Sequence, residues 1–515
     1  MIKKHFHYYT QHLTADISAG IVVFLVALPL CLGIALASGA PLFSGLIAGM
    51  VGGIIVSWFS GSQLSVSGPA AGLTVIVFSA IESLGSYSGF QVAVLLAGAL
   101  QLVLGFLKAG VISAYFPSSV IKGMLAAIGV ILILKQLPHA VGYDASLEGD
   151  ESYMQETVVT TFEEMLSSLS AISPGATLVS VVSLLILMLW ESGFIKRFAV
   201  LRLVPGALLV VVWGVLFNIA AMHFAPEWAI SKKHLVSLPA AGNPAEFLKL
   251  LSFPDFTFLS EVKIYPIALT LAIVASLETL LSLEAVDKID PLKRVAPTNR
   301  ELKAQGVGNM ISSMLGGMPV TAVIVRSAAN VNAGGHSKIS SFVHGLLLLV
   351  STLFFSSALN LIPLSCLAAI LLQTGYKLAK PKLFLEFYQK GLNQFIPFVS
   401  TVLAILLTDL LKGIAVGMLI GLYYVIRANY AAAISLTQSG NHYLLRLNKD
   451  VTFLNRALLR KYLGGIEADS FLYIDGSKTR FIDHDILETI EDFMQSASDN
   501  NIEVETKDLQ GKEKI

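Results

Sequence analysis

The sequence is short of charged residues. Only 14% of its 515 residues are Asp, Glu, Lys or Arg, whereas a soluble domain carries about 25%. Apolar residues make up 55% of the chain, so an ordinary soluble fold is excluded and an integral membrane protein is predicted. The 35 basic and 35 acidic side chains balance, and no basic stripe is present, which argues against a nucleic-acid partner.

Cysteine and catalytic motifs are scarce as well. The two cysteines, Cys31 and Cys366, both lie in apolar helical runs and are predicted to be core residues, not a disulfide or a metal pair. The apolar segments contain no His-Glu-x-x-His zinc motif and no nucleophile–base signature. The sequence therefore argues against a membrane enzyme, and we expect no metal or organic cofactor.

Apolar segments fill the chain up to about residue 430. We predict fourteen membrane elements, near 17–37, 42–59, 64–82, 90–108, 119–137, 174–190, 200–221, 264–285, 300–317, 318–331, 338–356, 359–376, 395–411 and 413–430. The segments 64–82 and 318–331 are irregular, because their Gly, Pro and β-branched residues leave no straight apolar run of the roughly 20 residues that a span needs. An even number of elements places both termini on one side.

Lysine and arginine indicate which side that is. The loop 286–303 holds five of them, the loop 377–394 holds four and the loop 191–202 holds three, whereas the loop 138–173 holds none. Loops rich in Lys and Arg stay in the cytoplasm, and in this count they share a side with the termini. We therefore predict a multi-pass protein of the inner (plasma) membrane with both termini cytoplasmic.

The two halves of the membrane part resemble each other weakly. The stretches 57–61 and 313–317 are similar, and each precedes an irregular segment. Seven elements fall in each half, an odd number, so the second copy is inverted in the membrane. Short, Gly/Pro-interrupted segments at corresponding places of two halves are the best sequence indication of a transporter binding site.

Small residues and one arginine mark this predicted site. Ala70, Ala71 and Gly72 begin one half-helix, and Arg326 and Ser327 begin the other. The unpaired N–H groups and positive dipole end of a helix start attract anions, and arginine is a permanent cation with several donors. A charge at bilayer depth is costly and usually functional. We predict an anion site; a broken helix with a snorkelling arginine is the alternative.

A carboxylate, Glu278, lies in the otherwise apolar helix 264–285. Ionised, it is expensive in such surroundings, so it should be paired, protonated or bound to a cation. A buried ion pair that only braces the helices is the structural alternative.

The composition changes near residue 440. Alternating or buried strand patterns occur at 443–447, 470–475 and 502–505, with helical patterns at 455–463 and 483–497 between them. We predict a cytosolic N-terminus over 1–14, a transmembrane domain over 15–432 and a small cytosolic α/β domain over 441–510.

Several short stretches, each weak alone, recur here in a characteristic order and spacing. They include Ala27-Leu28-Pro29, Gly68-Pro69, Gly98-Ala99-Leu100-Gln101, Gln305-Gly306-Val307-Gly308-Asn309 and Thr408-Asp409-Leu410. Together they resemble the SulP family of inorganic anion transporters over nearly the whole chain. The resemblance implies a seven-plus-seven inverted repeat divided into core and gate domains, a STAS-like C-terminal domain and a homodimer. The serine that soluble STAS proteins phosphorylate has no counterpart at 482–485.

The resemblance also implies a function. We expect a secondary active transporter of a small oxyanion, bicarbonate or sulfate, that works by an elevator-like motion; the alternatives are a passive anion channel or exchanger and a nucleobase permease of the same fold. By family position, Leu30 and Ile34 line the pocket. Sodium-coupled relatives hold the ion at the positions of Glu278, Ser282 and Thr74, but they carry small residues in place of Arg326.

Two coupling ions therefore remain open, a proton and sodium. We favour the proton. In that hypothesis an ionised Glu278–Arg326 pair in the empty state is broken when the anion arrives, which makes Glu278 take up a proton.

Overall fold

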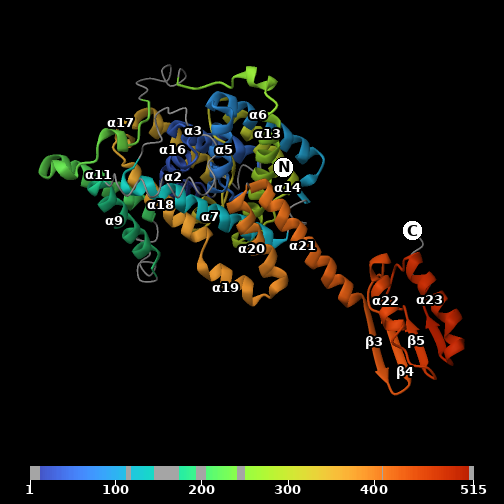
Figure 1. Cartoon of the computed structure of the whole chain (residues 1–515). Helices are drawn as coiled ribbons and strands as arrows, with labels where there is room; N and C mark the ends of the chain where they lie inside the picture. Colours follow the sequence, from blue (N-terminus) through green and yellow to red (C-terminus); the bar gives the residue numbers. More distant parts are fainter. Residues whose placement is uncertain are drawn as a thin grey trace. The chain divides into compact units, whose positions relative to one another are not determined.

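The computed structural model describes residues 12–111, 117–143, 173–192, 204–239, 250–408 and 410–509. The chain divides into two compact units, Met1–Gly417 and Met418–Ile515, and Figure 1 follows it from one to the other. Six of the described helices are long and apolar enough to cross a membrane. The predicted loops 138–173 and 191–202 and the residue Asp409 lie largely or wholly outside the described residues.

The membrane part is helical, as predicted. The first half contains α2 (Leu13–Ala37), α3 (Leu42–Val51) with η1 (Gly52–Val56) and α4 (Ser57–Phe59), α5 (Thr74–Leu84), α6 (Tyr87–Phe106), α7 (Ser118–Val141), α9 (Pro174–Glu191) and α11 (Gly206–Phe224). The second half contains α13 (Ile264–Ile289), α14 (Thr298–Met314), α15 (Ile324–Asn332), α16 (Ile339–Phe354), α18 (Leu364–Leu378), α20 (Leu392–Leu407) and α21 (Leu410–Ala433). Among the described residues, each of the fourteen predicted elements has its counterpart, which confirms the fold class.

The two irregular segments meet each other in the membrane part. In the first half, β1 (Ser67–Gly68) and η2 (Ala71–Leu73) precede α5; in the second half, β2 (Thr321–Ala322) precedes α15. The strands pair antiparallel, with Ser67 opposite Ala322 and Gly68 opposite Thr321. Backbone groups at membrane depth need partners inside the protein, and each broken segment supplies them to the other.

Glycine allows a close helix crossing between the two halves. A Cβ atom on Gly129 of α7 would lie 2.6 Å from the carbonyl oxygen of Gly375, and one on Gly375 of α18 would lie 2.7 Å from that of Gly129. Real Cβ atoms do not approach so closely, so both positions need glycine for the backbones to touch. The reciprocal contact joins the fifth element of each half.

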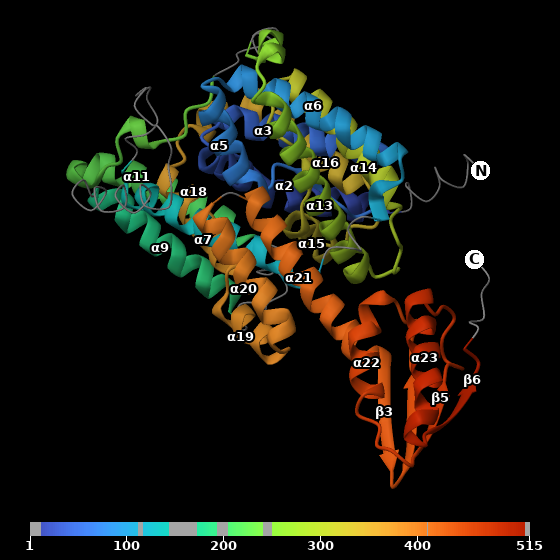
Figure 2. The same cartoon turned by 45° about the vertical axis from the view of Figure 1, so that its right-hand side comes forward.

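The C-terminal unit holds a four-stranded sheet in the order β3 (Ile434–Ser439), β4 (His442–Leu447), β5 (Phe471–Asp475), β6 (Glu503–Lys507). The strands β3 and β4 form a hairpin, whereas β4, β5 and β6 run parallel. The helices α22 (Arg456–Leu463) and α23 (His484–Ala497) pack side by side against the sheet (Figure 2). The predicted strands and helices are present; β3, which continues directly from α21, was not expected.

An aspartate at the end of β5 stabilises this sheet. The side chain of Asp475 is 11% exposed, and its Oδ2 lies 3.0 Å from Nε of Arg446 on the neighbouring strand. Its Oδ1 accepts hydrogen bonds from the hydroxyl and the backbone N–H of Ser477. These two hydrogen bonds, followed by the Arg446 charge, lower the pKa of Asp475 to about 2.

We expect the C-terminal unit to lose stability in acid. Because folding lowers the pKa of Asp475, its contribution is complete above the ordinary aspartate pKa of about 4 and is lost as the pH falls towards about 2, a loss of roughly 2 kcal/mol. Urea titrations at several pH values measure this loss of stability, with proteolysis of the C-terminal unit as the readout of unfolding. Asp475→Asn should remove the acid dependence; an unchanged dependence in that variant would contradict the assignment.

Candidate functional site

Arg326 lies inside the membrane part, against the start of the first irregular segment. Its side chain is fully buried, and its Nη2 donates to the carbonyl oxygen of Pro69 over 3.2 Å. A Cβ on Gly68 would collide with Nη1 of Arg326, so any larger residue there would displace the guanidinium. Within the described residues no nitrogen or oxygen atom accepts from Nε or Nη1, and the buried Cys31 thiol lies beside the guanidinium. The sequence analysis predicted Arg326 close to residues 70–72; in the structure its guanidinium lies beside Gly68 and Pro69, which precede these residues directly.

Both helix starts next to Arg326 lack side-chain caps. The residues preceding the helical turns, Ala70 and Val323, are extended and make no capping hydrogen bond. The first N–H groups that bond back into their own turn are those of Leu73 and Ser327. Earlier N–H groups in each turn, including that of Arg326, have no backbone acceptor among the described residues. Because β1 and β2 pair just before these starts, the two helix starts lie close together; at the first of them the Gly72 N–H donates to Glu278.

Glu278 faces the first of these helix starts. Its carboxylate on α13 accepts a hydrogen bond from the backbone N–H of Gly72, and a Cβ on Gly72 would lie 2.5 Å from its Oε1. Its Oε2 has no partner within the described part of the chain. The carboxylate therefore occupies the same helix start that was predicted to bind the anion.

The expected ion pair between Glu278 and Arg326 does not form. Neither the hydrogen bonds nor the electrostatic contacts of these two described residues join them. The reason is that each finds a backbone partner: the guanidinium binds the Pro69 carbonyl, and the carboxylate binds the Gly72 N–H. The coupling hypothesis that rested on breaking this pair is corrected accordingly.

The other predicted site residues differ in their surroundings. Thr74 donates its hydroxyl to the carbonyl oxygen of Ala71, and Ser282 is buried one turn after Glu278 on α13. Leu30 and Ile34 are buried on α2, which packs against α5 and α15. Thr74 begins α5 itself, whereas the roles predicted for Ser282, Leu30 and Ile34 stay predictions.

Ser327 has a bracing contact. Its hydroxyl donates to the carbonyl oxygen of Val323 over 2.7 Å and accepts the N–H of Val66 over 2.9 Å. Its own N–H bonds to Val323. Ser327 thus fastens the two irregular segments together. The sequence had suggested that its N–H and hydroxyl donors bind the anion, but both are already used within the protein.

Amide side chains that the sequence analysis gave no role hold β2 in place. Asn309 on α14 binds both the N–H and the carbonyl oxygen of Val320, and its amide also donates to Gln101 on α6 over 2.7 Å. Thr279, next to Glu278, accepts the N–H of Ala322 over 3.2 Å. Buried amides in apolar helices were the available signal, because such groups must find a partner.

Lys135 is a further intramembrane cation that the sequence analysis missed. It lies on α7, and its Nζ is 3.2 Å from the ring centroid of Phe78 on α5. Phe78 follows Thr74 by one helical turn, so this cation–π contact joins α7 to α5 one turn after the start of α5. Ionisable residues inside membranes are functional candidates by default.

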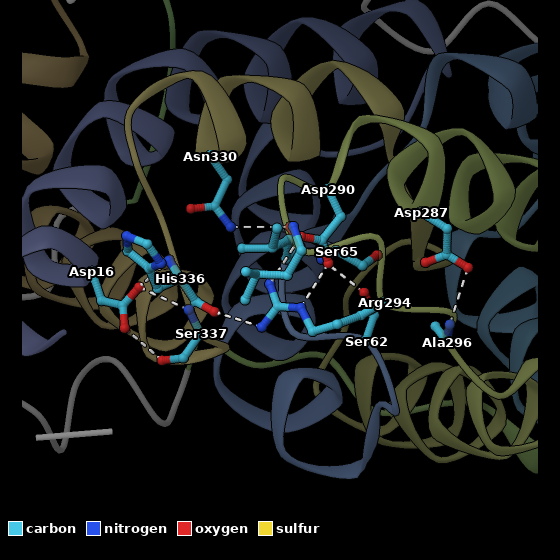
Figure 3. A network of polar contacts seen from close by, with 12 residues as sticks. Asp16, Ser62, Ser65, Asp287, Asp290, Arg294, Ala296, Asn330, His336 and Ser337 are labelled. Carbon is cyan, nitrogen blue, oxygen red and sulfur yellow. Dashed lines mark hydrogen bonds and ion pairs between the residues drawn. The ribbon is translucent and has the colours of Figure 1, made fainter. Parts of the chain in front are cut away.

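A polar network joins three segments of the membrane part (Figure 3). The buried Asp16 of α2 accepts the backbone N–H groups of His336 and Ser337 and the Ser337 hydroxyl. Arg294 in turn donates to the carbonyl oxygen of His336 over 3.0 Å and pairs with Asp290 over 2.7 Å. The network ties the loop after α13 and the loop before α16 to the start of α2.

Comparison with known proteins identifies the family. Residues 13–419 match the profile of the Sulfate permease family. The chain is 30% identical to YvdB of Bacillus subtilis over 82% of its length and 75% of that protein. It is 26% identical to the bicarbonate transporter BicA of Picosynechococcus over 81% of its length and 70% of that protein.

Two solved structures share the fold. The transmembrane domain of a cyanobacterial bicarbonate transporter BicA aligns with a TM-score of 0.64 at 23% identity, over 80% of this chain and 97% of that one. The overall structure of SLC26A9 aligns with a TM-score of 0.78 at 18% identity, over 97% of this chain and 84% of that one. The profile match covers most of the chain, and the broken, paired segments lie within it. The chain therefore belongs to the Sulfate permease family, whose members are transporters and not enzymes.

Proposed function

We propose that the protein is a secondary active transporter of a small inorganic oxyanion, either bicarbonate or sulfate. The observation that carries the proposal is the β1–β2 pairing, which sets two uncapped helix starts beside the buried Arg326. Free N–H groups and a guanidinium are the donors that an oxyanion needs. The relatives BicA and YvdB and the family name support an anion as the substrate.

Glu278 is the proposed coupling residue. Its carboxylate and the incoming anion would share the N–H groups at the start of η2. Two negative charges at one site repel each other strongly in a medium of low dielectric constant, so anion binding favours the protonated carboxyl group. This argument supports proton symport and replaces the one based on an ion pair. In the sodium alternative, Glu278, Ser282 and the oxygen of Thr74 hold the cation.

Alternating access is proposed to move the core against the gate. The Asp16 network fastens three segments of the first and second halves to one another, which suits a body that moves as one piece. Lys135 belongs to α7, outside that network, and its contact with Phe78 would break during the motion. We also propose that both termini are cytoplasmic and that the protein works as a homodimer in the inner membrane.

Removing the Lys135–Phe78 contact should open the path on the face where α5 and α7 end. A half-buried cation–π contact contributes about 1 kcal/mol, so Phe78→Leu should raise the labelling rate of a cysteine placed at Ala71, probed from that face, by about fivefold. The native Cys31 and Cys366 are buried. Phe78→Tyr keeps the ring and should keep the slow labelling rate. Lys122→Gln removes another lysine of α7, the helix of Lys135, and should also keep the slow rate. Equal labelling rates in Phe78→Leu and the parent would show that the Lys135–Phe78 contact does not close the path.

Uptake into proteoliposomes tests the proposed function. Labelled bicarbonate and sulfate are offered separately, each under an imposed proton gradient, an imposed sodium gradient or none. A symporter accumulates its anion only when the coupling gradient is present. Rapid equilibration without any gradient would indicate a channel instead, and uptake of a nucleobase in place of either anion would indicate a permease of the other class.

A further inference from the structure

The C-terminal unit contains a cleft that the transport site does not use. It has a volume of about 590 Å³, which is within the range of small-ligand pockets. It is formed within the second unit alone, by the last turns of α21, the loop after β4 with the short η9 helix (Phe453–Asn455), and the loop after β5. The strands β4 and β5 are parallel, so these two loops meet at the same edge of the sheet, the usual place for a ligand.

Basic side chains dominate the polar lining of this cleft. Lys449 comes from the loop after β4, and Lys478 and Arg480 come from the loop after β5, whereas Asp450 is the one acidic residue that lines it. Neither lysine side chain forms a hydrogen bond or an ion pair in the part of the chain that the structure describes. Three cations and one anion leave the cleft with a surplus of positive charge.

Asp450 offsets one of the three positive charges, that of Arg480 beside it, and its carboxylate also holds the two loops together. Its Oδ1 accepts the backbone N–H groups of Arg480 over 2.7 Å and of Phe481 over 3.1 Å. These hydrogen bonds keep the pKa of Asp450 below its ordinary value, so it remains charged and the loops remain fixed. The cations therefore surround a preformed space and are not attached to flexible segments.

The opposite wall of the cleft belongs to the end of the last membrane helix. Ile426, Tyr430 and Ala433 of α21 line it, together with Leu454. A helix rises 1.5 Å per residue, so about 20 residues cross the hydrocarbon layer, and counting from Lys412 near the start of α21 places Tyr430 at the membrane boundary. Tyrosine is enriched at this depth. Because α21 is one continuous helix, we expect its last turns, and the cleft that they line, to lie near the lipid headgroups.

We propose that this cleft binds the phosphate headgroup of an anionic membrane phospholipid. The three basic side chains contact the phosphodiester, and the apolar wall formed by α21 and Leu454 lies against the glycerol and the first acyl carbons. Bound in this way, the lipid connects the last membrane helix to both sheet loops, so it stabilises the C-terminal unit where it joins the membrane.

The test compares full-length protein in detergent supplemented with phosphatidylglycerol or with phosphatidylcholine. Native mass spectrometry counts retained lipids, and thermal unfolding reports their effect. Each basic residue near a membrane contributes about fivefold to lipid affinity, so the triple variant Lys449→Gln, Lys478→Gln, Arg480→Gln should bind phosphatidylglycerol about a hundredfold more weakly. The parent should be stabilised by phosphatidylglycerol and not by phosphatidylcholine.

A matched triple variant controls for net charge. Arg460, Lys461 and Lys507 are exposed residues of the same unit outside the cleft, and their replacement by glutamine should leave phosphatidylglycerol binding intact. An equal loss in both triple variants would overturn the site. If inorganic phosphate or glycerol 3-phosphate stabilised the parent as much as phosphatidylglycerol does, the ligand of the cleft would be a free phosphate and not a lipid. In phosphatidylcholine, both triple variants should unfold at the same temperature as the parent, which shows that neither is misfolded.

Discussion

Arg326→Ala is expected to abolish anion uptake while leaving the protein folded and inserted. The guanidinium is fully buried, and two of its nitrogens have no nitrogen or oxygen acceptor among the described residues, so in our proposal it supplies charge-assisted hydrogen bonds to the substrate. Each such bond is worth about 1.5–3 kcal/mol, which corresponds to a loss of at least about tenfold to a hundredfold in substrate affinity. Binding of labelled anion and uptake into proteoliposomes measure the two effects separately.

Two companion variants make this result specific. Arg326→Lys keeps the charge but not the planar set of donors, so we expect partial activity. Arg460→Ala removes an exposed arginine of the C-terminal unit and should transport normally. Full transport by Arg326→Ala would show that the substrate binds elsewhere.

Glu278→Gln is expected to separate anion movement from the driving gradient. Glutamine has the shape of a protonated glutamate and cannot ionise, so the repulsion between the carboxylate and the anion disappears. The variant should still bind and exchange anion, but an imposed proton gradient should no longer accelerate uptake or cause accumulation. Parallel measurements in a sodium gradient distinguish the two candidate ions, since only the coupling ion loses its effect.

Glu284→Gln is the matched control for that experiment. Glu284 lies on the same helix, is exposed and pairs with Lys288 over 2.6 Å, so its loss should leave the gradient dependence unchanged. If Glu278→Gln keeps the proton and sodium responses of the parent, Glu278 has no coupling role.

Much of the fold could be predicted because it depends on the length of the apolar segments and on the glycine and proline residues that interrupt them. The fourteen elements follow from apolar runs, and the two broken ones follow from Gly68-Pro69 and Gly316-Gly317 with Pro319. The sequence also placed Arg326 next to residues 70–72, because inverted halves bring corresponding segments together. Strand β3 escaped prediction because it follows α21 without any turn residue between them.

The orientation of individual side chains could not be predicted in the same way. Glu278 and Arg326 are opposite charges near one site, and pairing them was the simplest hypothesis. The structure satisfies each with a backbone group instead, because broken helices expose free N–H and carbonyl groups that an ordinary helix does not have. Lys135 was overlooked for a similar reason: its partner, Phe78, is a ring and not a charge.

The short pairing of β1 with β2 also constrains how the chain is made. Ser67 finds its partner only when Ala322 has been synthesised, and translation at about 5–20 residues per second takes on the order of ten to fifty seconds to cover that interval. During this time the nascent first half exposes unsatisfied backbone groups at bilayer depth. Its biogenesis therefore requires the insertion machinery to shelter residues 64–73 until the second half arrives, and neither half can complete its own centre alone.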